Sequence, residues 1–255
     1  MLKDKDEAVA LEQEKRQVRS EDLTTQLIRE KEARLAREPN NLKTLRDLAE
    51  LHAQKKDFDK ALEYYERIRS SEGGTDPSLE RNIADTALKR FDHLMGQLDP
   101  NLPEQAEKLA QLQVQRQEYQ LAECKARSER YPTDLQIRFD LGVLYFHAGK
   151  TSEAIQELQK AQGNPQRRLL AMSYLAQSFA KRGMNDMAAR KLQEALKEKV
   201  AFDDERKDLI YALGSVLEKM GKKEEAIEQF KLIYEVDIGY KDVAAKVDAF
   251  YASQG

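Results

Sequence analysis

The sequence is poor in three residue types: it contains one cysteine, no tryptophan and six prolines in 255 residues. A single cysteine, Cys124, excludes an internal disulfide framework. No apolar run approaches the roughly 20 residues that a membrane-spanning helix requires. The first residues, Met-Leu-Lys-Asp-Lys-Asp-Glu, lack the apolar core of a secretory signal peptide. We therefore expect a cytoplasmic protein with no direct membrane span.

An excess of charge of one sign is also missing. The net charge is −3, and the 43 basic residues are interspersed with 46 acidic ones. Without a basic stripe, the chain is not expected to bind nucleic acid. Hydrophobic residues make up 40% of the chain. That share is low for a single globular core but sufficient for a repeat array, in which each unit buries only the faces it shares with its neighbours.

A pattern of small and large residues recurs along the second half of the chain. It begins Leu-Gly-x-x-Tyr, continues with Gly and then Ala, and ends Leu-x-x-Ala. The three copies are Leu141, Gly142, Tyr145, Gly149, Ala154, Leu158 and Ala161; Leu175, Ala176, Phe179, Gly183, Ala188, Leu192 and Ala195; and Leu213, Gly214, Leu217, Gly221, Ala226, Phe230 and Ile233. The second copy follows the first by 34 residues, a period typical of helical repeat arrays.

Each copy predicts two short amphipathic helices joined by a turn. Apolar residues of the first helix recur at three- and four-residue spacing, as in Leu209, Leu213 and Val216. A glycine then follows, where a left-handed helix cap is least costly for this residue. Small residues on both helices would allow close approach, and they are Gly142, Ala176 and Gly214 on the first helices and Ala154, Ala188 and Ala226 on the second.

This pattern resembles that of tetratricopeptide repeat proteins, which runs Trp-x-x-Leu-Gly-x-x-Tyr, then Ala-x-x-x-Phe, then Pro. A fourth copy near the start matches it through Leu48, Ala49, His52, Ala61 and Tyr65. The family's tryptophan is replaced throughout, by Leu45, Arg138, Met172 and Ile210. The chain is most similar to bacterial tetratricopeptide proteins without assigned activity. The resemblance implies an all-α fold, an α-solenoid of antiparallel helix pairs wound into a right-handed superhelix.

The organisation expected along the chain has five parts. They are a charged N-terminal helix and cap at 1–38, a first repeat at 39–76, a degenerate repeat with an elongated helical hairpin at 77–134, three regular repeats at 135–238, and a C-terminal capping helix at 239–255. In the first part, Leu23, Leu27, Ile28 and Leu35 mark a packed helix. An end helix is needed because a solenoid must cover its last exposed face.

Residues that could carry chemistry are isolated from one another. His52, His93 and His147 each lack a second metal ligand one helical turn away. Cys124 has no adjacent base that would activate it as a nucleophile. No glycine-rich loop carries the lysine that phosphate binding requires. We therefore expect no catalytic residues, no metal, no cofactor and no enzymatic activity.

The resemblance places partner binding in the concave groove, on exposed positions of the first helix of each repeat. These positions are Phe139, Val143, His147, Ser173, Tyr174, Gln177, Lys181, Tyr211, Ser215 and Lys219. The family's chaperone-tail binders hold a terminal carboxylate with Asn, Lys and Arg at such positions. The asparagine is missing here, so that activity is not carried over. Phe139, Tyr174 and Tyr211 form a candidate aromatic wall for a partner; alternatively, one or two of them pack between neighbouring repeats.

Two functions are compatible with this pattern. The first is a non-enzymatic scaffold or adaptor that binds a protein or peptide segment with apolar anchors in the groove. The alternative is a self-assembling structural subunit, a homo-oligomer formed through the charged N-terminal helix or the long central helix expected at 104–130.

Overall fold

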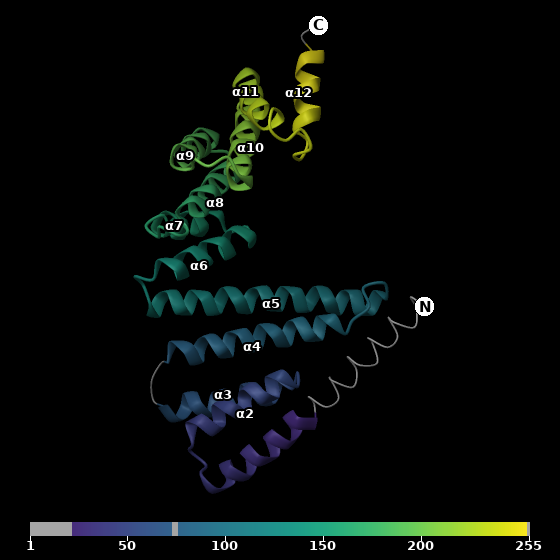
Figure 1. Cartoon of the computed structure of the whole chain (residues 1–255), viewed down its shortest axis with the longest axis vertical. Helices are drawn as coiled ribbons and strands as arrows, with labels where there is room; N and C mark the ends of the chain where they lie inside the picture. Colours follow the sequence, from purple (N-terminus) through teal and green to yellow (C-terminus); the bar gives the residue numbers. More distant parts are fainter. Residues whose placement is uncertain (1–21, 73–75, 254–255) are drawn as a thin grey trace. The chain divides into compact units, whose positions relative to one another are not determined.

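The structure is a computed structural model that describes residues 22–72 and 76–253, and these residues form helices and turns without a strand. Residues 22–37 are helical. The helices that follow, shown in Figure 1, are α2 (Leu42–Gln54), α3 (Phe58–Glu72), α4 (Pro77–Gly96), α5 (Pro103–Arg130), α6 (Leu135–His147), α7 (Thr151–Ala161), α8 (Arg168–Lys181), α9 (Asn185–Glu198), α10 (Asp204–Lys219), α11 (Lys223–Tyr234) and α12 (Val243–Ala252). The expected all-α solenoid is confirmed. The charged segment 1–21 lies outside the described residues.

The chain packs as two units, the first ending at Gln120 and the second beginning at Leu121. The boundary falls within α5 because the two parts of this helix have different neighbours. Tyr119 lies against Phe91 of α4, with ring centroids 6.1 Å apart. Cys124, one turn further on, is buried with Ile137 and Leu141 of α6. Burial raises the pKa of the Cys124 thiol to about 12, so the thiol is protonated at neutral pH.

The core of the first unit joins the helix at 22–37 to α2, α3 and the start of α4. Ile28 and Leu35 are buried in it, with Leu45 and Leu48 of α2. Leu23 and Leu27 are 55% and 44% exposed, so the packed face of the first helix is narrower than its apolar residues predicted. Ile28 and Leu35 lie seven residues apart, on one stripe of the helix, and the other two leucines fall outside that stripe.

In the first unit, α4 and the part of α5 that ends at Gln120 lie side by side (Figure 1). Arg116 of α5 is paired with Asp92 of α4, with Nε and Oδ1 2.7 Å apart. Among the residues of α5, only Cys124 and Ser128 are buried. The earlier turns of α5 are therefore held by half-buried and polar contacts, which explains why this helix has no regular apolar stripe.

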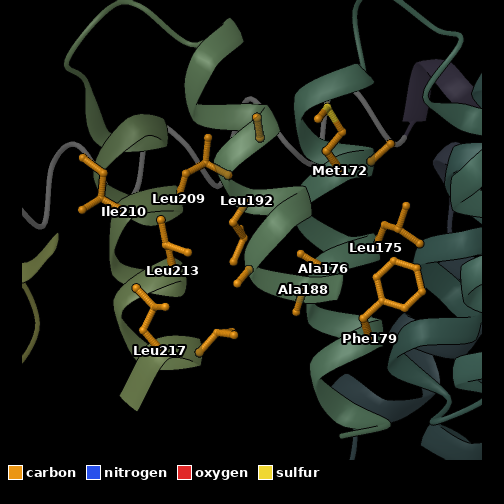
Figure 2. Close-up of a cluster of buried hydrophobic side chains, with 14 of the residues drawn as sticks. Met172, Leu175, Ala176, Phe179, Ala188, Leu192, Leu209, Ile210, Leu213 and Leu217 are labelled. Atoms are coloured by element: carbon orange, nitrogen blue, oxygen red, sulfur yellow. The ribbon is translucent and has the colours of Figure 1, made fainter. Parts of the chain in front are cut away.

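The second unit consists of three helix pairs, α6–α7, α8–α9 and α10–α11, followed by α12. Its continuous core includes Met172, Leu175, Leu192, Leu213 and Phe230. Figure 2 shows the shared core of two pairs: Met172 to Phe179 on α8 and Leu209 to Leu217 on α10 run in the same direction, and Ala188 to Leu192 on α9 run in the opposite one. The first helices of these two pairs, α8 and α10, are thus parallel.

Small residues set how closely the two helices of a pair approach. A Cβ atom added at Gly142 would lie 2.7 Å from Cγ of Leu158 and 3.2 Å from its backbone nitrogen. At Gly214 it would lie 2.7 Å from two ring carbons of Phe230. Real Cβ contacts are not this short, so each glycine permits an approach that alanine would not.

The turn between the helices of a pair requires a left-handed residue. Gly149, Gly183 and Gly221 have φ of 73°, 75° and 76°, as their positions in the pattern predicted. In the first repeat Lys56 takes this place, with φ of 62°. A non-glycine residue in this conformation is strained because its Cβ approaches the following carbonyl oxygen.

We expect Lys56→Gly to raise the free energy of unfolding of the first unit by about 1 kcal/mol, because glycine adopts this backbone conformation without strain. The reverse change, Gly183→Ala, is expected to lower the stability of the second unit by a similar amount, about 1 kcal/mol. Urea denaturation followed by circular dichroism measures both. A loss of stability in Lys56→Gly would show that the lysine side chain contributes more than its backbone strain costs.

One of the places that hold the family's tryptophan is polar in this chain. Leu45, Met172 and Ile210 are buried there with at most 2% exposed. Arg138 instead forms an ion pair with Glu157 of α7, with Nη1 and Oε2 2.8 Å apart. The Arg138 guanidinium also donates from Nη2 to the carbonyl oxygen of Pro132 at 3.1 Å. The first regular repeat therefore replaces an apolar contact between its helices with a nearly buried ion pair.

Candidate partner-binding groove

Helices α8 and α10 form the two walls of a groove of about 820 Å³ within the second unit. The walls are parallel, so successive turns of the two helices face each other across the groove. Seven of the residues predicted to bind a partner line it, namely Ser173, Tyr174, Gln177, Lys181, Tyr211, Ser215 and Lys219. The structure thus brings the α8 and α10 positions together on one concave surface.

The three predicted residues on α6 do not line this groove. Phe139 is only 8% exposed and packs edge-on against Tyr174, with ring centroids 6.2 Å apart. Val143 is half-buried against the same core, and His147 is exposed at the end of α6. The proposed aromatic wall is therefore corrected to two residues. Phe139 fills the contact between neighbouring repeats, where apolar area is removed from water.

The base of the groove is apolar and firmly packed. Phe146, Ala176, Ala180, Leu192 and Ala212 are among its lining residues. The Tyr174 ring meets the Phe146 ring edge-on, with centroids 5.2 Å apart. On the opposite wall, the Tyr211 ring lies 5.7 Å from the ring of Phe230. Both tyrosines are half-buried, so each presents part of its ring on a rigid support.

One end of the groove is completed by a segment that the sequence pattern did not indicate. Lys241, in the linker between α11 and α12, lines the groove beside Asp208 and Tyr211 of α10. Tyr211 donates a hydrogen bond to Asp242, and Tyr240 donates one to Asp208, both at 2.6 Å. The Lys241 ammonium lies 2.6 Å from Asp208 and 4.4 Å from the centroid of the Tyr211 ring.

The hydrogen bonds to Asp242 and Asp208 stabilise the protonated forms of the Tyr211 and Tyr240 phenols. Because the Tyr211 hydroxyl donates a hydrogen bond to the Asp242 carboxylate, the pKa of Tyr211 is raised to about 12. Burial, followed by the bond to Asp208, raises the pKa of Tyr240 as well. The two hydrogen bonds and the Lys241–Asp208 ion pair join the linker to α10. No helical periodicity points to it, so repeat matching could not have found Lys241.

The groove offers apolar and hydrogen-bonding contacts. In the described part of the chain, no three His, Cys, Asp or Glu side chains gather as a metal site would require. Within the same residues, no helix has the length and apolar content to cross a membrane. Among the described residues, buried side-chain polar atoms of His52, Tyr131 and Asn185 lack a hydrogen-bond partner, and none of these three residues lines the groove.

Comparison with known proteins identifies the repeat. Two family models of the tetratricopeptide repeat match the chain, one over residues 31–77 and 107–167 and the other over residues 208–237. Together they cover more than half of the sequence. No curated protein matches it.

Solved structures of MamA have a similar fold. A structure of MamA AMB-1 is 18% identical, with a TM-score of 0.51 over 81% of this chain and 97% of that chain. A crystal structure of MamA is 20% identical, with a TM-score of 0.50 over 58% of this chain and 84% of that chain. At these identities the likeness concerns the fold alone. With the family models, it shows that the chain belongs to the tetratricopeptide repeat family and has the fold of a protein-interaction scaffold.

Proposed function

We propose that the chain is a scaffold or adaptor that binds a segment of a partner protein in the groove between α8 and α10. Tetratricopeptide repeats are in general non-enzymatic modules that bind proteins. The observation that carries this proposal is the pair Tyr174 and Tyr211, which face one groove from opposite walls above an apolar base. Half-buried aromatic residues on a rigid support are the side chains that most often dominate binding energy.

The size and polarity of the groove favour a peptide segment. Its volume of about 820 Å³ lies in the range of sites that enclose a small ligand or a few side chains. Polar side chains alternate with the aromatic ones, as Ser173, Gln177 and Ser215 do. Gln177 is exposed and its Nε2 lies 3.3 Å from Ser173 Oγ, and because both residues line the groove, a peptide backbone could bond to them. A segment with two apolar anchors fits this arrangement.

Truncation of either tyrosine is expected to weaken partner binding by about 2 kcal/mol, or about 30-fold, because each is an aromatic anchor. The partner is first obtained by affinity capture from the source cells. Its binding to Tyr174→Ala and Tyr211→Ala is then compared by calorimetry. Tyr211→Phe is a further variant, because it removes the bond to Asp242 but keeps the ring.

The matched control is Tyr251→Ala, a tyrosine on α12 that is 54% exposed and lies outside the groove. It is expected to bind the partner as the unchanged protein does. If all four variants bound equally well, the partner would contact another surface and the proposal for this groove would be wrong.

Self-assembly is the second candidate, and one observation favours it. Val114 of α5 is 54% exposed, and Leu102 just before this helix is 48% exposed. An apolar surface on a long helix can pack against a second copy of the same chain. Light scattering of the pure protein separates the two functions. A mass that rises with concentration would favour self-assembly, and a constant monomer mass would favour the adaptor.

A further inference from the structure

We propose that the segment bound in the groove carries an acidic side chain beside its apolar anchors, and that Lys181 and Lys219 bind its carboxylate. This inference rests on the partner-binding function proposed above and adds the chemistry of the partner. It also gives the segment a direction, because the two ends of the groove differ in charge.

The two lysines lie at the same end of the groove. Lys181 is the last residue of α8 and Lys219 is the last residue of α10. Both line the groove, and the two helices run in the same direction, as Met172 to Phe179 and Leu209 to Leu217 show in Figure 2. The acidic residues of the lining, Glu205 and Asp208, belong to the first turns of α10 and therefore lie at the opposite end.

The acidic end is neutralised within the protein. Glu205 is paired with Lys199, with Oε2 and Nζ 2.6 Å apart. Asp208 is paired with Lys241 at 2.6 Å and also accepts the hydrogen bond from Tyr240. These carboxylates therefore have little remaining capacity to attract a basic residue of a partner.

The basic end is not neutralised. Among the described residues, neither Lys181 nor Lys219 forms an ion pair with a carboxylate. Lys181 is held in place, because its Nζ lies 3.6 Å from the centroid of the Phe146 ring and donates to the Phe146 carbonyl oxygen at 3.3 Å. An ammonium has three donors, so Lys181 can still bind an anion. Two cations beside an apolar base are complementary to an apolar segment that bears a carboxylate.

Lysines at the ends of helices also have a simpler role, which is to stabilise the negative end of the helix dipole. That role affects stability and predicts no preference among ligands. The test must therefore measure which charge the partner carries, and not only whether the variants bind less well.

Short random peptides, displayed with their C-termini fused so that no free carboxylate is present, are selected for binding to the full chain. In parallel they are selected on the charge-reversed variant K181E/K219E. We expect peptides from the unchanged protein to share two apolar residues and an Asp or Glu at a fixed spacing. Peptides from the reversed variant should carry Lys or Arg at that place.

The strongest peptide from the unchanged protein is then synthesised with its acidic residue or with the matching amide. Amide replacement is expected to weaken binding to the unchanged protein about 10-fold, the effect of a charge-assisted bond pair. On K181Q/K219Q, the same amide replacement in the peptide should weaken binding less than about 2-fold, because the two ammonium groups that pair with the peptide carboxylate are absent. Lys197→Gln, on the exposed part of α9, is the control and should behave as the unchanged protein.

The outcomes separate this inference from the function on which it rests. Selected peptides that carry no acidic residue, or an amide effect that is equal on both proteins, would overturn the assignment of the two lysines. Peptides that bind Tyr174→Ala as well as the unchanged protein, or no enrichment at all, would instead contradict binding in the groove. Circular dichroism of each variant verifies that it is folded.

Discussion

Replacing Gly214 with leucine is expected to lower the free energy of unfolding of the second unit by about 3 kcal/mol, at the upper end of overpacking costs. Gly214 faces the ring of Phe230 across the α10–α11 pair, and even a Cβ atom would lie 2.7 Å from two ring carbons. Phe230 is fully buried, so its ring cannot move toward solvent to relieve the contact. The helices must separate, and the adjoining core around Leu213 and Ile233 would lose packing.

Chemical denaturation followed by circular dichroism measures the loss. Gly96→Leu is the matched control, because a Cβ atom at Gly96, the last residue of α4, would meet nothing within 4 Å. This variant should unfold close to the midpoint of the unchanged protein. A Gly214→Leu midpoint that equalled the control would mean that the register of α10 on α11 differs from the one described.

A second large effect is expected at the ion pair that replaces the family's tryptophan contact. Glu157→Leu should cost about 3 kcal/mol of stability, because removing one partner leaves the nearly buried Arg138 guanidinium without an ionic partner. The side chains of Arg138 and Glu157 are 14% and 11% exposed, so water can solvate the remaining guanidinium only poorly. Lys160 also loses its carboxylate partner, which lies 2.9 Å from its Nζ.

The double variant Arg138→Met/Glu157→Leu is expected to recover most of this loss, because well-packed apolar residues can replace a buried ion pair without cost. Methionine is the residue that the next repeat has at the same place, where Met172 is 1% exposed. Thermal unfolding of the two single variants and the double variant gives the coupling between the positions. Losses that simply added up would show that the two charges are solvated independently.

The repeat could be predicted from the sequence because its signals are local and periodic. Gly142 and Gly214 stand where a large residue faces them across a helix pair, and Gly183 stands where the turn needs a positive φ. Each requirement restricts one position to a few residue types, and the same restriction recurs at the matching position of each repeat. Seven groove positions on α8 and α10 followed from the same register, because exposed positions are fixed once the packed ones are known.

Other features depend on contacts between distant segments, and no periodic signal encodes them. Phe139 occupies a groove position of its helix, but Tyr174 packs edge-on against its ring, and the Arg167 guanidinium carbon lies 5.7 Å from the ring centroid. Lys241 reaches the groove from a linker through Asp208. The division of α5 at Gln120 reflects different neighbours at its two ends rather than a change in its composition. Pattern matching assigns each residue to its own helix and cannot see such neighbours.

Site-specific photocrosslinking in the source cells tests the central proposal, binding in the groove, most directly. A photoreactive amino acid is placed at Gln177 in the groove, at Gln193 on the exposed part of α9, or at Val114 on α5. Binding in the groove predicts a partner adduct from Gln177 that disappears when Tyr211→Ala is added, and no such adduct from Gln193. Adducts from Val114 to a second copy of the chain, with none from Gln177, would contradict it.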